Sequence, residues 1–200
     1  DGLLVSKGIV DGIGGTGGRY TLAQRHRFLR VGAPEFFRVQ NAKGGPLEIM
    51  GDCGAFTYVA EETPPYSVDD VIEFYLDGHF DHGISVDHVI LEYQRAWDSP
   101  RGLESDERKA YLRAKSRQEC TLELAKEFLA RVRRGRLSFT PLGVAQGWSP
   151  KSYAHAVTQL QKMGYDRIAI GGMVPLKTVE IHEVLVAANG APVRVRIASG

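Results

Sequence analysis

The stretch LEIMGDCGAF, from Leu47 to Phe56, decides how the fold of this chain is interpreted. Its apolar start predicts a short buried strand, and the glycine that follows lets the backbone turn sharply. Asp52 lies where this strand ends. An acid at the carboxyl end of a buried strand, with an aromatic residue nearby, is a common way to hold a flat polar ligand. A lone aspartate in a turn more often binds its own backbone, so the rest of the chain must decide.

The composition is that of an ordinary globular protein. The chain has 200 residues, of which 43% are hydrophobic and 24% are charged, and its formal net charge is +1. This length suits one domain or most of a larger one. The two cysteines, Cys53 and Cys120, are far apart in the sequence and match no zinc spacing. Nothing suggests a disulfide framework, which fits a reducing, cytoplasmic location. No apolar run reaches the length of a membrane span, so we expect no membrane partner.

Short apolar strands alternate with amphipathic helices along the chain. Strands are predicted over residues 3–6, 47–51, 83–91, 137–145, 167–170 and 192–198, with a short extended piece over 35–39. Helices are predicted over 20–30, 67–75, 105–134, 149–163 and 176–188. This order implies an α/β fold with a parallel sheet and crossover helices. We expect a single domain over residues 1–200 that forms an incomplete (β/α)8 TIM-type barrel of about six βα units, with an open doubly wound sheet as the alternative.

Polar residues and glycines stand at four successive strand ends. Both architectures place functional groups at the carboxyl ends of the strands. The residues at these ends are Asp52, Asp87, Gln146 with Gly147, and Gly171 with Gly172 and Met173. Carboxylates, an amide and an accessible backbone suit the edge of a purine-like base, and Phe56 and Met173 suit its faces. Each residue alone is more simply a turn or core residue, and their recurrence at four strand ends favours a site.

Four segments carry motifs of a known family in the family's order. Residues 51–56 are similar to its Asp-Ser-Gly-Gly-Phe/Tyr segment, and residues 86–87 to its Phe-Asp-Glu-Cys segment. Residues 142–147, LGVAQG, are similar to its Gly-Ile-Val-Gln-Gly segment. Residues 164–172, GYDRIAIGG, are similar to its Gly-x-x-Gly-Tyr-Ala-Ile-Gly-Gly segment. The last two are the specific matches, and from Gly51 to Thr178 the chain resembles the tRNA-guanine transglycosylases.

The resemblance implies a barrel enzyme that exchanges guanine for a 7-deazaguanine in a polynucleotide. A nucleophilic Asp attacks the anomeric carbon and expels guanine, and the new base then displaces the enzyme. By position, the resemblance implies that Asp52 is the acid/base partner of the exchanged base. It also implies that the ring lies between Phe56 and Met173. The residues it implies at the edge of the base are Asp87, Gln146 and Gly172, and we expect Gly147 and Gly171 to bind the substrate as well.

The chain also departs from the family pattern. His88 follows Asp87 where the family has Glu-Cys, Ala55 replaces a Gly, and Met173 replaces a Leu. This looser match resembles the divergent branch that places 7-cyano-7-deazaguanine (preQ0) into DNA, with a tRNA enzyme of the queuosine or archaeosine pathway as the alternative. In both cases the target base must leave its stack. The implied partners are DNA or tRNA, the deazaguanine base, and the proteins of a DNA-modification system.

Two expectations concern residues outside this sequence. The acids after Gly172 are Glu180 and Glu183, and both fall in a predicted helix. The Cys-x-Cys-x-x-Cys zinc motif of the family has no counterpart in the chain. We therefore expect the nucleophilic Asp, the last two strands and any structural zinc beyond Gly200, and no metal site within the chain.

A different class of function stays open. The glycine-rich run from Gly12 to Gly18 follows a predicted strand and contains Gly-x-Gly-x-x-Gly, but it lacks the Lys-Ser/Thr of a phosphate loop. If this run held a phosphate, the chain would belong to a barrel enzyme acting on a small phosphorylated metabolite. A non-catalytic homologue is the remaining alternative.

Overall fold

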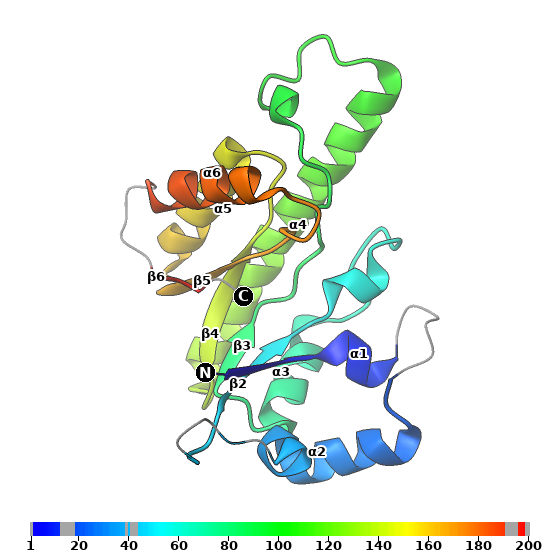
Figure 1. Cartoon of the computed structure of the whole chain (residues 1–200), viewed down its shortest axis with the longest axis vertical. Coiled ribbons are helices and arrows are strands. Elements are labelled where there is room, and N and C mark those ends of the chain that lie inside the picture. The colour runs from blue at the N-terminus through cyan, green and yellow to red at the C-terminus, as the bar shows by residue number, and fades with distance from the viewer. Residues whose placement is uncertain (1, 13–18, 39, 41–43, 191–195, 199–200) are drawn as a thin grey trace. The chain divides into compact units, whose positions relative to one another are not determined.

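Parallel strands alternate with helices in the computed structural model, which describes residues 2–12, 19–38, 40, 44–190 and 196–198 (Figure 1). The strands are β1 (Gly2–Ser6), β2 (Glu48–Asp52), β3 (His82–Ile84), β4 (Thr140–Ala145), β5 (Arg167–Ile170) and β6 (Arg196–Ala198). The α-helices are α1 (Lys7–Asp11), α2 (Leu22–Phe37), α3 (Val68–Asp77), α4 (Ser105–Gly135), α5 (Pro150–Met163) and α6 (Thr178–Asn189). There are also two short 3₁₀ helices: η1 (Ala55–Tyr58) follows β2, and η2 (Arg95–Asp98) precedes α4.

The strands lie in the sheet in chain order. The order is β1-β2-β3-β4-β5-β6, and every pairing is parallel. A doubly wound sheet reverses its strand order at a switch point, and the described strands show no reversal. The mixed α/β class with a parallel sheet is therefore confirmed, and the doubly wound alternative is wrong.

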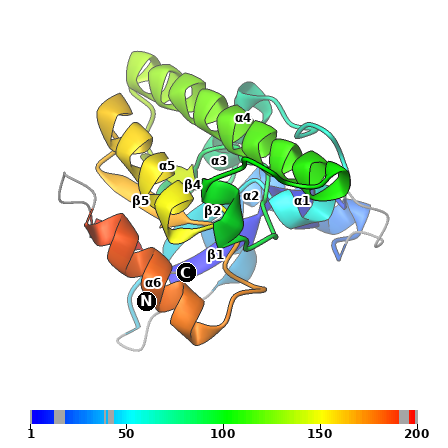
Figure 2. The ribbon, with the colours of Figure 1, turned by 90° about the horizontal axis from the view of Figure 1, so that it is seen from above.

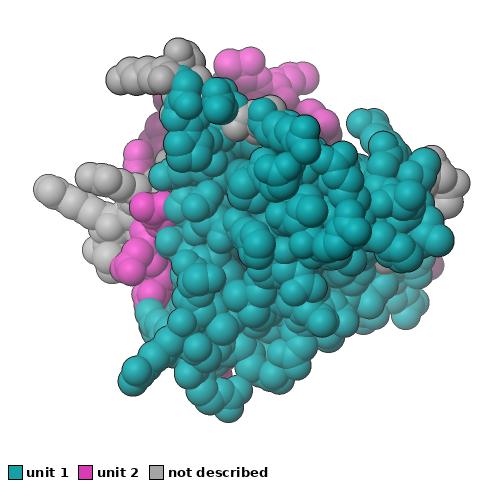
Figure 3. Space-filling view, turned by 90° about the horizontal axis from the view of Figure 1, so that it is seen from below, with its two compact units in different colours: residues 1–86, 127–142 teal, residues 87–126, 143–200 magenta. Residues whose placement is uncertain are grey.

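The chain divides into two compact units (Figure 3). Unit 1 comprises residues 1–86 and 127–142, and unit 2 comprises residues 87–126 and 143–200. The first three strands and the start of β4 belong to unit 1, and the rest of β4 with β5 and β6 belongs to unit 2. Helix α4 contributes residues to both units. In unit 2, α5 and α6 pack against each other (Figure 2). That the whole chain acts as one domain stays a prediction.

Aromatic packing on the sheet holds unit 1 together. Tyr75 of α3 is completely buried, and its hydroxyl donates a hydrogen bond to the Ile84 carbonyl oxygen at 2.7 Å. Its ring packs edge-on against Phe80, Phe128 and Phe139. A Cβ atom on Gly51 of β2 or on Gly83 of β3 would overlap this ring. These two glycines therefore let Tyr75 lie directly on the strand backbone, which fixes β2 just before Asp52.

Three helices begin directly after a residue whose side chain caps them. Thr21 caps α2, Ser67 caps α3 and Ser149 caps α5, and each hydroxyl accepts a hydrogen bond from the backbone N–H three residues later. Pro150 stands in the first turn of α5, and Gly164 ends that helix with φ 96°. The sequence therefore predicted these boundaries through local chemistry alone.

Three local predictions were wrong. The extended piece predicted over 35–39 falls largely in α2, which runs on past residue 30 through a kink at Gly32 (φ 74°). The strand predicted over 83–91 ends at Ile84, so Asp87 follows the strand instead of lying within it. Helix α1 was not predicted. The run from residue 13 to 18 and the predicted strand residues 192–195 lie outside the described residues.

The helices carry no sign of a membrane span. The longest described helix, α4, is strongly charged along its length. No described helix is long and apolar enough to cross a bilayer.

Replacing Gly51 by Ala tests the contact between Tyr75 and β2. The added methyl group would force the ring off the strand, and such overpacking lowers the free energy of unfolding by about 1–3 kcal/mol. Gly190→Ala is the matched control, because the nearest atoms to its added Cβ lie at 3.5 and 3.7 Å and its φ is −75°. Urea denaturation measures both variants. Equal stabilities of the two variants would contradict the packing described for Tyr75.

Candidate functional site

Asp87 and Gln146 form a buried hydrogen bond in unit 2. Asp87 follows β3 and Gln146 follows β4, and their side chains are 4% and 2% exposed. Gln146 Nε2 donates to Asp87 Oδ2 at 2.6 Å. The Ile90 N–H donates to Gln146 Oε1 at 3.2 Å, which fixes the orientation of the amide. A buried carboxylate is costly unless it is hydrogen-bonded, so Gln146 stabilises Asp87 in its place.

The glycine pair after β5 makes room for the Gln146 amide. A Cβ atom on Gly171 would overlap Gln146 Nε2. A Cβ atom on Gly172 would lie 2.5 Å from the Ile90 carbonyl oxygen and 2.9 Å from Gln146 Oε1, and Gly172 has φ 72°. Tyr153 of α5 donates its hydroxyl hydrogen to the Gly171 carbonyl oxygen at 2.8 Å. The structure thus brings together four of the predicted site residues, namely Asp87, Gln146, Gly171 and Gly172.

Two further predicted residues of unit 2 have mainly local contacts. A Cβ atom on Gly147 would lie 2.8 Å from Ser152 Oγ and 2.9 Å from the Tyr153 ring, so this glycine lets the first turn of α5 approach β4. Met173 is partly buried, and its carbonyl oxygen accepts a hydrogen bond from the Leu176 N–H at 3.0 Å in the turn before α6.

Three side chains of α4 that belong to none of the sequence motifs hold the backbone around Asp87 and Gln146. They are Arg117, Gln118 and Thr121, and they are 9%, 6% and 1% exposed. Arg117 Nη1 donates to the Val89 carbonyl oxygen at 3.0 Å. Gln118 Nε2 donates to the carbonyl oxygens of Gln146, at 2.7 Å, and Ser152, at 3.1 Å. The Thr121 hydroxyl oxygen accepts from the His88 N–H at 3.0 Å. The sequence carries one signal for this role. These polar residues lie about one helical turn apart, on a helix face that also carries buried alanines.

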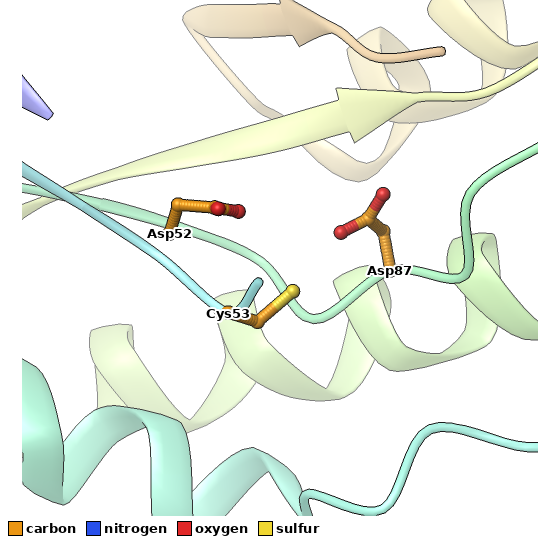
Figure 4. A group of neighbouring side chains, drawn as sticks. All are labelled: Asp52, Cys53 and Asp87. Atoms are coloured by element: carbon orange, nitrogen blue, oxygen red, sulfur yellow. The ribbon is translucent and has the colours of Figure 1, made fainter. Parts of the chain in front are cut away.

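Asp52 ends β2 in unit 1, at the strand end where it was predicted (Figure 4). Its register partner is Ser6 at the end of β1. The carboxylate accepts hydrogen bonds from the Ser6 side chain and from the backbone N–H groups of Cys53 and Gly54. Burial outweighs these bonds and raises the pKa of Asp52 above its usual value. A carboxyl with a raised pKa is suited to giving and taking a proton.

The turn after Asp52 is tightly packed against the end of β1. Gly54 has φ 86°, and a Cβ atom there would lie 2.6 Å from Ser6 Oγ and 2.8 Å from the Gly8 nitrogen. The Gly8 N–H donates to the Cys53 carbonyl oxygen at 3.2 Å. Phe56 follows in η1 with its side chain 50% exposed, so its ring is available to a ligand.

Cys53 carries a metal-ligating sulfur next to Asp52 in the sequence. Cys53 is completely buried, and its sulfur accepts a hydrogen bond from the Tyr58 hydroxyl at 3.0 Å. Figure 4 shows Cys53 beside Asp52 at the end of β2, and Asp87 on the segment after β3. Among the described residues, no three His, Cys, Asp or Glu side chains of one unit gather as a metal site.

The pKa of Asp52 predicts a pH-dependent stability. Because the folded-state pKa lies above the unfolded value of about 3.9, the unfolded chain ionises first, and the fold loses stability as pH rises from about 4 through the folded pKa. Asp52→Asn removes this loss. We expect the variant to gain free energy of unfolding over the unmodified protein at pH 8, and this gain to shrink as pH falls toward about 4. Urea denaturation from pH 4 to 8 measures it, with Asp77→Asn at an exposed position as the control. A gain independent of pH would contradict the raised pKa.

Gln118→Leu tests the support that α4 gives to Gln146. The substitution keeps the side-chain size but leaves two buried carbonyl oxygens without their donor, which lowers the free energy of unfolding by about 1–3 kcal/mol. Gln94→Leu, where the side chain is exposed, is the control and should change stability by less than about 0.5 kcal/mol. Equal effects of the two substitutions would show that Gln118 does not hold these carbonyls.

Comparison with known proteins shows what this chain is similar to. No protein-family profile matches the chain. Over 185 residues it is 47% identical to a DNA-guanine transglycosylase of Salmonella montevideo. The aligned part covers 92% of this chain and 42% of that protein, so the chain spans less than half the length of this relative. Identity at this level over nearly the whole chain places it in the guanine transglycosylase family.

Proposed function

We propose that the chain is part of an enzyme that replaces guanine in DNA by 7-cyano-7-deazaguanine (preQ0), with tRNA as the alternative substrate. The observation that carries this proposal is the buried Asp87 carboxylate, which Gln146 holds beside Gly171 and Gly172. The relative's name supports guanine exchange in DNA. The sequential parallel strand order supports a (β/α)8 barrel, to which this chain contributes six strands.

In this proposal Asp87 and Gly172 read the edge of the base. Guanine presents a ring N–H and an exocyclic amine side by side, and one carboxylate can accept from both. The same edge carries a carbonyl oxygen that needs a donor. The Gly171 N–H is engaged with the Ala145 carbonyl oxygen at 3.0 Å. The Gly172 N–H has no hydrogen-bond partner within the described part of the chain, so it is the donor we assign to the carbonyl.

The role of Gln146 in this proposal is to position Asp87, with Gly147 allowing α5 to approach. Both ends of the Gln146 amide are already engaged, by Asp87 and by the Ile90 N–H. Its remaining amide hydrogen and oxygen lone pair are available to the base as well. We assign Phe56 and Met173 to the two faces of the ring.

We assign proton transfer to Asp52. A nucleophilic Asp, expected outside residues 1–200, attacks the anomeric carbon as the bond to the guanine nitrogen breaks. Asp52 gives its proton to the departing guanine. The incoming deazaguanine then loses a proton to Asp52, its nitrogen bonds to the anomeric carbon, and the nucleophile is released. A carboxyl with a raised pKa holds a proton for the first step and takes one back in the second.

Incorporation of labelled guanine tests the proposed function. Full-length protein is incubated with labelled guanine and either duplex DNA or tRNA, and the polymer is recovered and counted. We expect label in DNA, and its release when unlabelled preQ0 is added. Label in tRNA alone would assign the alternative substrate, and label in neither polymer would contradict base exchange.

Asp52→Asn tests the assigned proton transfer. Loss of a general acid/base lowers the exchange rate by about 10²–10⁴-fold. Asp77→Asn, at an exposed position on α3, should exchange at the unmodified rate. Circular dichroism confirms that both variants are folded. Retained exchange in a folded Asp52→Asn protein would remove Asp52 from the mechanism.

A further inference from the structure

Two arginines line a hollow at the start of α4. Its volume is about 230 Å³, and its lining residues are Pro100, Arg101, Arg108, Tyr111 and Leu112. All of them belong to unit 2. Figure 1 shows this segment in green, with the loop after η2 leading into the first turns of α4. The hollow is formed by residues to which neither the motifs nor the proposed chemistry assigns a role.

The two guanidinium groups of the hollow have no partner among the described residues. Neither Arg101 nor Arg108 makes a side-chain hydrogen bond or an ion pair there. Two acids close by in the sequence are engaged elsewhere: Asp98 accepts from Ser149 Oγ at 2.6 Å, and Glu107 accepts from Trp97 Nε1 at 3.2 Å. Two unpaired arginines that share one hollow favour an anionic ligand with several oxygen acceptors.

Tyr111, in the apolar wall of the hollow, packs against a buried core cluster. The Tyr111 ring makes edge-on contacts with Trp97, at 6.0 Å between centroids, and with Trp148, at 5.7 Å. Both tryptophans are buried in a core cluster with Ile90 and Ala114. Leu112, 52% exposed, adds apolar surface at the mouth. A free inorganic anion has no apolar surface that could contact this wall. A nucleotide unit has one, because it joins a phosphate to a sugar and a base.

We propose that this hollow binds a phosphodiester of the DNA next to the exchanged guanine. Arg101 and Arg108 contact the phosphate oxygens, and Tyr111 and Leu112 contact the adjoining sugar or base. The inference rests on the proposed function, because it takes DNA as the polymer. A contact of this kind positions the strand and adds affinity without reading sequence. It therefore acts on DNA binding and not on the chemical step.

The double variant Arg101→Gln/Arg108→Gln in the full-length protein tests the inference. Affinity for a fluorescent DNA duplex is measured between 50 and 200 mM salt. Each neutralised phosphate contributes about 0.9 to the slope of log affinity against log salt, so we expect the slope to fall by about 1–2 and the affinity at 50 mM salt to fall roughly 10-fold or more. In the exchange assay, KM for DNA should rise by a similar factor while kcat stays the same.

Two further variants separate this site from a general charge effect. Lys126→Gln/Lys162→Gln removes the same formal charge at exposed positions of unit 2 and should leave the slope nearly unchanged. Arg101→Lys/Arg108→Lys keeps the charge but loses the planar fork, and should recover part of the affinity. An unchanged slope and affinity in the arginine-to-glutamine variant would overturn the inference. So would an equal loss in the lysine control.

Competition with inorganic phosphate and with a dinucleotide identifies the ligand. We expect the dinucleotide to displace DNA from the unmodified protein at lower concentration than phosphate does, and this advantage to vanish in Arg101→Gln/Arg108→Gln. Equal competition by phosphate would mark a free-anion site and overturn the inference. Failure of the proposed function is distinguishable, because guanine exchange would then be absent while DNA binding still depended on the two arginines.

Discussion

The hydrogen bond from Gln146 to Asp87 is the interaction on which the rest of the proposed site depends. At 2.6 Å it holds a carboxylate that is 4% exposed, and a carboxylate so buried needs a donor to stay in place. The amide can make this bond because Gly171 and Gly172 have no side chains to displace it. From the sequence, Gly171 and Gly172 were predicted to expose their backbone to a ligand. In the structure, their lack of side chains is what allows the Gln146 amide to pack. Any base recognition by Asp87 follows from that packing.

Asp87 and Asp52, the two aspartates of the proposed site, have different surroundings. Asp87 is fixed by a donor from a neighbouring strand end, and the α4 residue Gln118 in turn fixes the backbone of Gln146. Such layered support suits a group that binds and orients a base. Asp52 ends β2 in the other unit, where burial raises its pKa against the bonds it accepts from Ser6 and the following turn. That balance suits a group that exchanges protons. Different surroundings therefore give one residue type two tasks.

The sequence predicted the fold best where local chemistry decides it. Capping residues such as Ser67 and Ser149 fixed the helix starts, and apolar runs fixed the strand β5. Asp87 was misplaced into a strand because a continuous apolar run looks the same whether it pairs with a neighbour or packs as irregular chain. The support from Arg117 was missed for a related reason. Its side chain contacts the Val89 carbonyl oxygen, 28 residues earlier in the sequence, and periodicity does not report such a contact.

Guanine density in a crystal of the full-length protein tests the central claim most directly. The account predicts a bound purine whose ring N–H and amine face the Asp87 carboxylate, with its carbonyl oxygen toward the Gly172 N–H. The Gln146 amide should keep its bond to Asp87 when the base is present. Guanine bound at another place, or bound with Asp87 turned away from its edge, would contradict the account.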